Sequence, residues 1–401
     1  MQVRITPSRA SGRVCAPPSK SVAHRLLILS AFTEGVSVIS NLPLCEDVLA
    51  TLDCLRSLGI EYRLDRDTVT VWGKSIRSLS PQSTLFCRES ASTLRFLLPV
   101  AILTGKEVRF SGSKSLLSRP LGEYEELFGM MGWVFKREDD LLVVQGDELP
   151  DTVKLRADVS SQFITGILLA YATSGKSGRL ELLSAPSSKP YIDLTIDALK
   201  QFGIQAKWET ERTITLSASP LSPISARVEG DFSAAANLEA FHFLGGEVVI
   251  DGLYDASLQA DRVYKELFSL LEREGACIDL DICPDLGPIL FALAAQGHGA
   301  SFTSCSRLRT KESDRVETTA LELSKLGAEL IVHGERVEVI AHPLHTPSIP
   351  LSSHGDHRVA MALIPLLSLV GGDITGVEAI NKSFPAYLAC IRALGIEAEE
   401  I

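Results

Sequence analysis

The sequence predicts an α/β fold of six repeated units, arranged as two lobes of three units each. Six helical patterns each end at a glycine followed by a strand-like run, and glycine suits this position because a positive φ carries no Cβ penalty there. These glycines recur at intervals of 73, 71, 72, 52 and 68 residues, and a period near seventy indicates repeats. The lobes are expected to meet near 227–231, after the proline- and serine-rich stretch 218–225. The glycines are Gly59, Gly132, Gly203, Gly275, Gly327 and Gly395.

Each unit is expected to combine two helices with several strands. The helices that lead into the glycines are expected at 47–58, 121–131, 192–202, 262–274, 315–326 and 386–394. A second set carries few charges and should be buried on most faces, at 25–31, 95–103, 161–173, 234–243, 287–295 and 358–369. Strands are expected at 1–6, 36–40, 68–72, 107–111, 141–145, 178–183, 213–217, 247–250, 300–304, 337–340 and 372–375. The alternative is an α/β protein whose glycines are spaced by coincidence.

Length and composition narrow the class of protein. The chain has 401 residues, 45% of them hydrophobic, which is enough for two or three domains with real cores. No apolar run reaches the ~18 residues that span a bilayer, and the chain starts as a strand rather than a signal peptide. The net charge of −11 argues against a general binder of nucleic acid or membrane surfaces. The eight cysteines are scattered, so we expect reduced, mostly buried thiols in a cytoplasmic protein.

The first apolar helix begins with cations. Ser19 is expected as its N-cap, which places Lys20 and Ser21 in the first turn, and Arg25 follows in the next. A lysine at this end opposes the helix dipole. An anion bound by Lys20, Ser21 and the free N–H groups would explain the arrangement. The alternative is a partly exposed Lys and Arg on an ordinary amphipathic helix.

Arginine and lysine recur with small hydroxyl residues where other helices start. Any one such place is usually a surface ion pair. Eight of them in an acidic chain favour a convergent cationic cleft for a small polyanionic substrate, between the lobes and closed by their motion. Besides Lys20 and Arg25, these places lie at 89–95, 117–122, 160–163, 187–191, 311–315, 354–358 and 382–385.

Two carboxylates are candidates for chemistry. Glu312 lies between Lys311 and Arg315, and Asp285 precedes an apolar helix. Both residues also have structural alternatives. Asp285 could be a helix N-cap, and Glu312 could be a helix-start carboxylate that pairs with Arg315.

Taken together, the motifs resemble the 5-enolpyruvylshikimate-3-phosphate synthase family over essentially the whole chain. They are Pro-Ser-Lys-Ser at 18–21 with Arg25, Ser-Ser-Gln at 160–162, Ser-Lys-Pro-Tyr at 188–191, Lys-Glu-Ser-Asp-Arg at 311–315, Asp-His-Arg at 356–358 and Lys-Ser-Phe-Pro at 382–385. The resemblance implies an inside-out α/β barrel of two lobes, each with three βαβαββ-type units and pseudo-threefold symmetry. It implies a first lobe of residues 19–226 and a second of 1–18 with 227–401, with the active site in the cleft between them.

The resemblance implies transfer of the enolpyruvyl group of phosphoenolpyruvate to the 5-hydroxyl of shikimate 3-phosphate, through a tetrahedral intermediate that then loses phosphate. This reaction belongs to the shikimate pathway, which leads to chorismate and the aromatic amino acids. The residues implied for shikimate 3-phosphate are Lys20, Ser21, Arg25, Ser160, Ser161, Gln162, Ser188, Tyr191, Asp285 and Lys311. Those implied for phosphoenolpyruvate are Lys20, Ala91, Arg119, Gln162, Arg315, Arg358 and Lys382.

The resemblance also implies catalytic roles. Asp285 would accept the proton of the attacking hydroxyl, and Glu312 and Lys20 are candidates to protonate the CH2 carbon or to shuttle that proton. No metal and no organic cofactor is expected. The expected partners are the two small substrates, with no nucleic acid and no membrane, and the expected state is a monomer.

The chain departs from the family pattern in three places. The usual Gly-Asn-x-Gly-Thr loop reads Arg-Glu-Ser-Ala-Ser at 88–92. Ala91 replaces a glycine whose backbone lines the phosphoenolpyruvate pocket, so its methyl group should weaken inhibitors that fill this pocket, such as glyphosate. Glu89 stands where an asparagine usually contacts ligand, and Arg307 stands where an asparagine often meets shikimate 3-phosphate.

Two rival functions are considered. The sister enolpyruvyl transferase family acts on UDP-N-acetylglucosamine and typically has a cysteine five residues before the Arg-Pro of its loop, where this chain has Lys114 before Arg119-Pro120. A two-lobed binding protein for a phosphorylated solute would have no need for Asp285 and Glu312 inside a cationic site.

Overall fold

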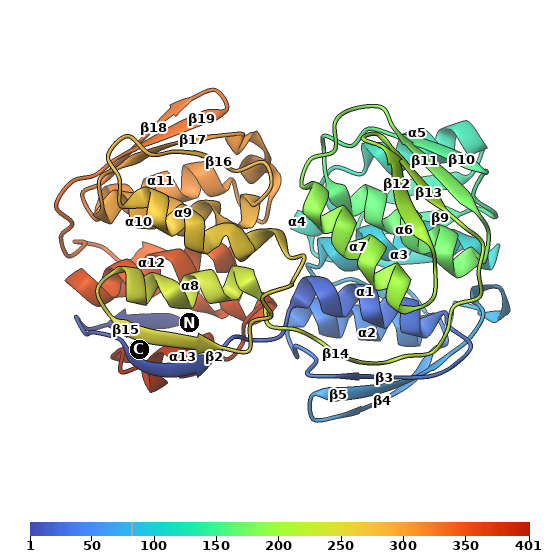
Figure 1. Ribbon diagram of the computed structural model, residues 1–401, viewed down its shortest axis with the longest axis horizontal. Helices are drawn as coiled ribbons and strands as arrows, with labels where there is room; N and C mark the ends of the chain where they lie inside the picture. The colour runs from blue at the N-terminus through green and yellow to red at the C-terminus, as the bar shows by residue number, and fades with distance from the viewer. Residues whose placement is uncertain (82) are drawn as a thin grey trace. The chain divides into compact units, whose positions relative to one another are not determined.

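The chain divides into two compact units. The computed structural model describes residues 1–81 and 83–401 (Figure 1). One unit, here called the internal unit, is Pro18–Glu229. The other, here called the terminal unit, combines Met1–Pro17 with Gly230–Ile401. Each has a hydrophobic core of its own.

The internal unit contains three four-stranded sheets with one shared topology. In each, the first two strands in space are parallel and the next two add antiparallel. Along β5 (Thr68–Gly73), for example, buried Val69 and Val71 alternate with the partly exposed Thr68 and Thr70, as the two-residue period of a half-buried strand requires. The sheets are β14 (Ser225–Arg227), β3 (Gly35–Ser40), β5 (Thr68–Gly73), β4 (Glu61–Asp65); β6 (Leu85–Phe86), β7 (Val108–Ser111), β9 (Leu141–Gln145), β8 (Val134–Glu138); and β10 (Thr152–Leu155), β11 (Gly178–Leu182), β13 (Thr213–Leu216), β12 (Ala206–Thr210).

The terminal unit repeats this topology in two of its three sheets. The first strand of the chain lies inside one of them, between strands from the last thirty residues. The third sheet has only two strands, and they are parallel. The sheets are β16 (Cys277–Asp279), β17 (Ala300–Thr303), β19 (Arg336–Ile340), β18 (Glu329–His333); β20 (Leu351–Ser352), β21 (Gly372–Thr375), β1 (Gln2–Ile5), β22 (Ala398–Glu400); and β15 (Glu247–Asp251), β2 (Ser11–Cys15).

A missing hairpin explains the one short interval between the glycines. In most repeats the helix that ends at the glycine is followed by two antiparallel strands, such as β4 and β5 after Gly59. After Gly275 the chain enters β16, which pairs in parallel with β17 and belongs to the next sheet. The interval to Gly327 is therefore 52 residues instead of about seventy.

The apolar helices lie where the sequence predicts them and are buried. Those of the internal unit pack on one another, and so do those of the terminal unit. In Figure 1 the strands of each unit lie outside its apolar helices, so the predicted α/β architecture with helices inside is confirmed. The apolar helices are α1 (Lys20–Ala31), α3 (Ala91–Ala101), α6 (Ser161–Ser174), α8 (Phe232–Phe243), α10 (Gly287–Gln296) and α12 (His357–Val370).

The helices that lead into the six glycines are also present. All six glycines have positive φ, between 68° and 99°. Five of them lie one or two residues after a helix end as predicted, whereas the helix expected at 262–274 ends earlier, at Leu271, four residues before Gly275. These helices are α2 (Glu46–Ser57), α5 (Gly122–Met131), α7 (Lys189–Gln201), α9 (Tyr264–Leu271), α11 (Arg315–Lys325) and α13 (Tyr387–Ala393). The short helices are α4 (Lys114–Leu117), η1 (Ile76–Ser78), η2 (Ile102–Thr104), η3 (Ala260–Val263), η4 (Pro284–Leu286), η5 (Cys305–Thr310) and η6 (Val377–Lys382).

The structure also describes the state of the cysteines and the character of the helices. All eight cysteines are free thiols, and five of them are buried. Among the described residues, none of the helices is both long enough and apolar enough to cross a bilayer.

Candidate active site

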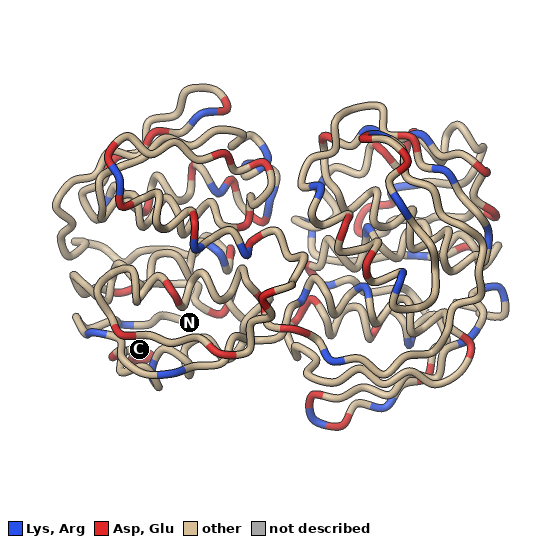
Figure 2. The backbone as a smooth tube through the Cα atoms, viewed as in Figure 1, with Lys and Arg blue, Asp and Glu red and all other residues tan. Residues whose placement is uncertain are grey.

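Seven charged residues of the terminal unit form one cluster, most of them at or next to helix starts. Six of them were predicted site residues, and Asp356 is the seventh. Asp285 lies in η4, Lys311 and Glu312 precede α11, Arg315 begins α11, and Arg358 is the second residue of α12. Lys382 ends η6. Along the rest of the described backbone, acidic and basic residues are interspersed (Figure 2).

Arg315 is the centre of this cluster. Only 1% of the residue is exposed. Its Nε donates to Asp356 Oδ2 at 2.8 Å, one terminal nitrogen donates to Asp285 Oδ1 at 2.9 Å, and the other donates to Glu312 Oε2 at 2.8 Å. Burial alone would lower the pKa of this guanidinium, but the three carboxylates outweigh burial and raise it. Arg315 is therefore a permanent cation held in one orientation.

Three cations lie close to the carboxylate of Asp285. Besides Arg315, Lys311 Nζ lies 3.3 Å from Oδ1 and an Arg358 nitrogen lies 3.6 Å from Oδ2. Burial would raise the pKa of Asp285, but Lys311, Arg358 and Arg315 hold it well below its ordinary value. Burial lowers the pKa of Lys311 in turn. The proposed N-cap role of Asp285 is wrong, because Leu286 stands at the N-cap of α10 and no side chain caps that helix.

Glu312 pairs with two cations. In addition to Arg315, Lys382 Nζ lies 3.2 Å from Glu312 Oε1. Its helix-start pairing with Arg315 is therefore real, but Asp314 is the residue that caps α11, by accepting from the backbone of Val316 and Glu317. Glu312 thus remains directed at the cations and not at the helix.

The guanidinium of Arg358 has one hydrogen-bond donor without a partner among the described residues. Its backbone N–H donates to the capping residue Asp356 at 2.9 Å. Its side-chain Nε is buried and has no hydrogen-bond partner within residues 1–81 and 83–401. A buried, unpaired donor on a guanidinium is uncommon and suits an anion as partner.

In the internal unit, α1 begins as predicted, and the lysine in its first turn has a carboxylate partner. Ser19 occupies the N-cap position, yet its side chain does not cap the helix. Lys20 Nζ lies 2.7 Å from Asp47 Oδ2 of α2, with 16% of the lysine side chain exposed. The Asp47 carboxylate therefore offsets a cation at the positive end of the helix, a partner that the sequence analysis missed.

Arg25 is buried, so the alternative of a partly exposed arginine is wrong for this residue. Only 3% of the residue is exposed, and its guanidinium lies 5.2 Å from the ring centre of Phe96. Its four hydrogen bonds go to neutral oxygens, and burial lowers its pKa to about 10. The acceptors are Thr195 Oγ1 at 2.9 Å, Ser21 O at 2.6 Å, Tyr191 O at 2.9 Å and Thr165 Oγ1 at 3.4 Å. A buried cation held by neutral groups is costly unless an anion joins it.

The start of α6 meets the start of α3. Ser160 caps α6 by accepting from Gln162 N, and Ser161 is buried beside it. The Gln162 amide donates to Ser92 Oγ at 3.0 Å and accepts from Arg95 at 2.8 Å. The sequence analysis included Arg95 among the helix starts of the expected cationic cleft but assigned it to neither substrate.

A glycine makes this meeting of helices possible. A Cβ at Gly166 of α6 would lie 2.5 Å from the Arg95 carbonyl of α3. Such a distance is too short for a carbon, so the two backbones could not pack this closely around an alanine. The close packing brings Gln162 to Arg95 and Ser92.

The altered loop ends where α3 begins. Ala91 is the first residue of α3 and is buried, and Ser90 caps the helix through Thr93 N. Arg88 has a positive φ of 53° and is tied to α2 through Glu46 and through Asp53 at 2.7 Å. Glu89 is exposed.

The remaining predicted residues lie at two further helix starts. Ser188 is the N-cap residue of α7, with φ of 50°, and Tyr191 is in its first turn. Arg119 follows α4, next to Pro120, whose carbonyl accepts from Arg95 at 2.8 Å. Arg307 is in η5 and donates to Asp281 O at 3.0 Å.

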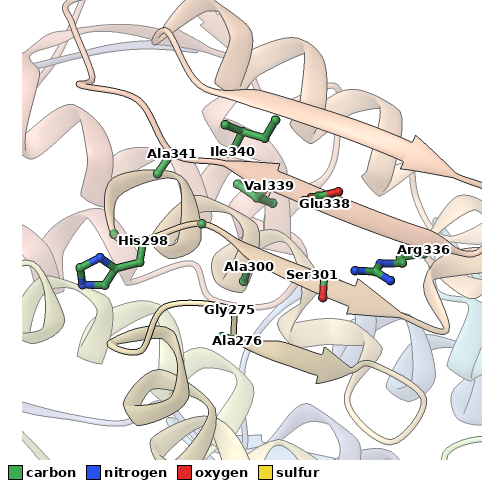
Figure 3. Close-up of a pocket in the computed structure, with 12 residues that line it drawn as sticks. Gly275, Ala276, His298, Ala300, Ser301, Arg336, Glu338, Val339, Ile340 and Ala341 are labelled. Atoms are coloured by element: carbon green, nitrogen blue, oxygen red, sulfur yellow. The ribbon is translucent and has the colours of Figure 1, made fainter.

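One hollow of the terminal unit is lined by other residues. It has a volume of about 560 Å³ and lies at β17 and β19 (Figure 3). Its walls include His298, Arg336 and Glu338, and it contains none of the predicted site residues. It adds nothing to the site.

The fold and the charged helix starts define the class of protein, and two solved structures show the fold. An EPSP synthase from Acinetobacter baumannii matches with a TM-score of 0.80 and 23% identity, over 100% of both chains. An enolpyruvyl transferase from Streptomyces tendae matches with a TM-score of 0.75 and 16% identity, over 99% of this chain and 98% of that one. The class is therefore that of the enolpyruvyl transferase fold.

Sequence comparison narrows the class to a family. Residues 5–391 match the family EPSP synthase (3-phosphoshikimate 1-carboxyvinyltransferase), and the chain belongs to this family. A 3-phosphoshikimate 1-carboxyvinyltransferase from Clostridium kluyveri is 34% identical over 427 aligned residues, which cover 99% of this chain and 98% of the relative. One from Clostridium novyi is 35% identical over 417, covering 96% and 95%.

Proposed function

We propose that this protein transfers the enolpyruvyl group of phosphoenolpyruvate to the 5-hydroxyl of shikimate 3-phosphate and releases phosphate, on the route to chorismate and the aromatic amino acids. One observation carries the proposal from residues to chemistry. Two carboxylates, Asp285 and Glu312, are hydrogen-bonded to the same buried cation, Arg315, within a cluster of four cations. A reaction of polyanions that needs proton transfer requires both kinds of group together.

The charges of the substrates support the assignment of the binding residues. Each substrate carries one phosphate and one carboxylate. Arg315, Arg358 and Lys382 bind phosphoenolpyruvate, and the free Nε of Arg358 is available to one of its oxygens. Lys311 binds shikimate 3-phosphate from the terminal unit.

The internal unit contributes the rest of the binding residues. Buried Arg25 supplies a cation to shikimate 3-phosphate, and Ser21, Ser160, Ser161, Ser188 and Tyr191 supply hydroxyl groups at helix starts. Lys20 and Gln162 contact both substrates. Arg119 and the α3 start at Ala91 complete the phosphoenolpyruvate site. Binding by helix starts uses N–H groups that the helices leave unpaired.

The reaction proceeds in two steps. In the addition step, the 5-oxygen of shikimate 3-phosphate bonds to C2 of phosphoenolpyruvate while C3 gains a proton, which gives a tetrahedral ketal. Asp285 accepts the hydroxyl proton, and Glu312 or Lys20 delivers the proton to C3. In the elimination step, C3 loses a proton and the bond from C2 to the phosphate oxygen breaks. The residues need only move protons and hold charge, so no metal or cofactor is required.

The free protein keeps Asp285 ionised and therefore a weak base. Three cations lower its pKa. When substrate anions bind Lys311, Arg315 and Arg358, the positive charge around Asp285 is partly neutralised, so its pKa rises. The carboxylate is thus ready before binding and becomes a better proton acceptor in the complex. The monomeric state and the cytoplasmic location stay predictions.

Phosphorus NMR of the reaction mixture tests the proposal. Phosphoenolpyruvate should disappear as inorganic phosphate forms in equal amount, and the phosphate of shikimate 3-phosphate should remain a monoester. Omission of shikimate 3-phosphate should stop the reaction. A bisphosphate product, or phosphate release without consumption of shikimate 3-phosphate, would exclude enolpyruvyl transfer.

A further inference from the structure

A buried histidine that the reaction does not use lies at the end of a chain of hydroxyl groups. His24 of α1 is 1% exposed, and its Nδ1 lies 2.8 Å from Thr51 Oγ1 of α2. Thr51 Oγ1 is in turn 2.8 Å from Thr93 Oγ1 of α3, which lies 2.7 Å from Ser90 Oγ. All of these side chains are buried. This chain of hydrogen bonds thus joins α1, α2 and α3 and ends at Ser90, the residue that caps α3.

The number of hydrogens decides which ring nitrogen carries the proton. The hydroxyl of Thr93 also lies 3.2 Å from the Asp47 carbonyl, which can only accept. If His24 donates from Nδ1 to Thr51, Thr51 can donate to Thr93 and Thr93 to an oxygen beyond it. The ring is then left only with a lone pair on Nε2, which has no partner among the described residues. The opposite tautomer would bury an unpaired N–H donor, which costs more.

The ring is also held as a neutral group. Burial lowers the pKa of His24 to about 3, which outweighs the opposing effect of the Asp47 carboxylate. Lys20 and Arg25, the two cations that face it, lower the pKa further. The edge of the ring packs against Phe96 of α3, with ring centres 6.2 Å apart. A neutral donor in a fixed tautomer is suited to orienting other groups and not to transferring protons.

The hydrogen-bond chain that starts at His24 and the hydrogen bonds of Arg25 connect α1 to different helices. Arg25 ties α1 to Thr165 of α6 and to Thr195 of α7. His24 ties the same helix to α2 and, through Thr93 and Ser90, to the first turn of α3. That turn begins at Ala91, and its Ser92 is held from the other side by Gln162. The position of the α3 start therefore depends on both Gln162 and the His24 chain.

We propose that His24 is a positioning residue for the phosphoenolpyruvate site, and that it acts by donating from Nδ1 through Thr51 and Thr93 to fix the first turn of α3. The inference rests on the function proposed above. It assigns His24 an effect on one substrate only, since the shikimate 3-phosphate contacts of α1 are held by Arg25. It requires a donor at Nδ1 and does not require an imidazole ring.

Two substitutions separate positioning from simple packing. His24→Leu keeps an apolar side chain but removes the donor, and His24→Asn places an amide N–H where Nδ1–H lies. Ser30→Ala is the matched control, because Ser30 Oγ is buried in the same helix with no hydrogen-bond partner among the described residues. Full steady-state kinetics on the intact chain, with each substrate varied in turn, give the readout.

The expected result is selective. His24→Leu raises the KM for phosphoenolpyruvate about tenfold, which corresponds to the loss of one buried hydrogen bond, and changes the KM for shikimate 3-phosphate less than about twofold. His24→Asn restores most of the loss, and Ser30→Ala leaves both constants unchanged. If His24→Leu does not fold, Thr51→Val removes the next link with little change of shape and should have the same selective effect.

Other results overturn the inference. Equal changes in both KM values, or an Asn variant no better than the Leu variant, would mean that His24 only packs. Nitrogen NMR of the histidine rings provides a second readout, since the signal lost in His24→Asn should be that of an Nδ1-protonated neutral ring. A signal from the other tautomer would also refute the proposal. Absence of any turnover in the unaltered chain would instead refute the proposed function.

Discussion

Replacing Asp285 by asparagine removes one charge from the terminal cluster and keeps the shape of the side chain. In the native cluster, three carboxylates pair with four cations, and Asp285 lies within 3.6 Å of three of those cations. The substitution leaves two carboxylates among the same four cations. It therefore tests both the chemistry and the electrostatics of the site.

The structure sets the size of the expected changes. Breaking a fully buried ion pair costs roughly 3–5 kcal/mol. About a quarter of the Asp285 side chain is exposed, at 26%, and Arg315 retains two other carboxylates, so we expect a loss of roughly 1–3 kcal/mol in the free energy of unfolding. Inorganic phosphate should recover part of this loss by replacing the missing negative charge. Turnover should fall by about 10²–10⁴, because a proton acceptor has been removed.

Two assays and one control make this prediction decisive. Thermal unfolding with and without phosphate measures stability, and phosphate release measures turnover. Asp373→Asn is the control, since Asp373 also pairs with an arginine of the terminal unit, Arg4 at 2.8 Å, but outside the cluster. It should leave turnover and phosphate stabilisation unchanged. Near-normal turnover of Asp285→Asn would remove Asp285 from the mechanism, and phosphate stabilisation equal to that of the native chain would refute the electrostatic account.

Three further predictions concern the loop, the buried arginine and pH. Glyphosate should inhibit the native enzyme weakly, and Ala91→Gly should bind it more tightly because the methyl group is gone; a submicromolar inhibition constant for the native chain would contradict this. Arg25→Met should weaken shikimate 3-phosphate binding by roughly ten- to a hundredfold in calorimetric titration. Its thermal stability should change little, because the substitution removes an uncompensated buried cation along with the hydrogen bonds of that cation. Unchanged affinity would exclude Arg25 from the site. Burial, assisted by the negative charge of Asp285, raises the pKa of Asp261 to about 7. Between about pH 4 and pH 7 the folded chain therefore holds a proton that the unfolded chain has released. The free energy of unfolding should fall as pH rises through this range. Urea unfolding of Asp261→Asn should lack that contribution, and an identical pH profile would refute it.

The repeated architecture was readable from the sequence because it rests on local rules. Glycine after a helix and uncharged helices between strands are visible in any window of ten to twenty residues. The two-stranded sheet was not predicted as such, although its signal was present in the short interval after Gly275. Strand partners depend on contacts distant in sequence, which no local window contains.

The candidate site was predicted unevenly, for a similar reason. Lys311, Glu312 and Arg315 are neighbours in sequence, and their motif shows the charges that meet in the fold. Asp356 lies in a motif noted for its Arg358, and only the structure reveals it as a partner of Arg315. Asp47 and His24 had no signal at all, because a carboxylate in a first turn and a histidine in an apolar helix are common in ordinary helices.

Phosphate release from phosphoenolpyruvate tests the central claim most directly. The purified chain is mixed with phosphoenolpyruvate and either shikimate 3-phosphate or UDP-N-acetylglucosamine, at equal concentrations. We predict continuous phosphate release with shikimate 3-phosphate and none with the sugar nucleotide. Release with the sugar nucleotide alone would mean that the acceptor is wrong, and release with neither would mean that the charged helix starts only bind anions.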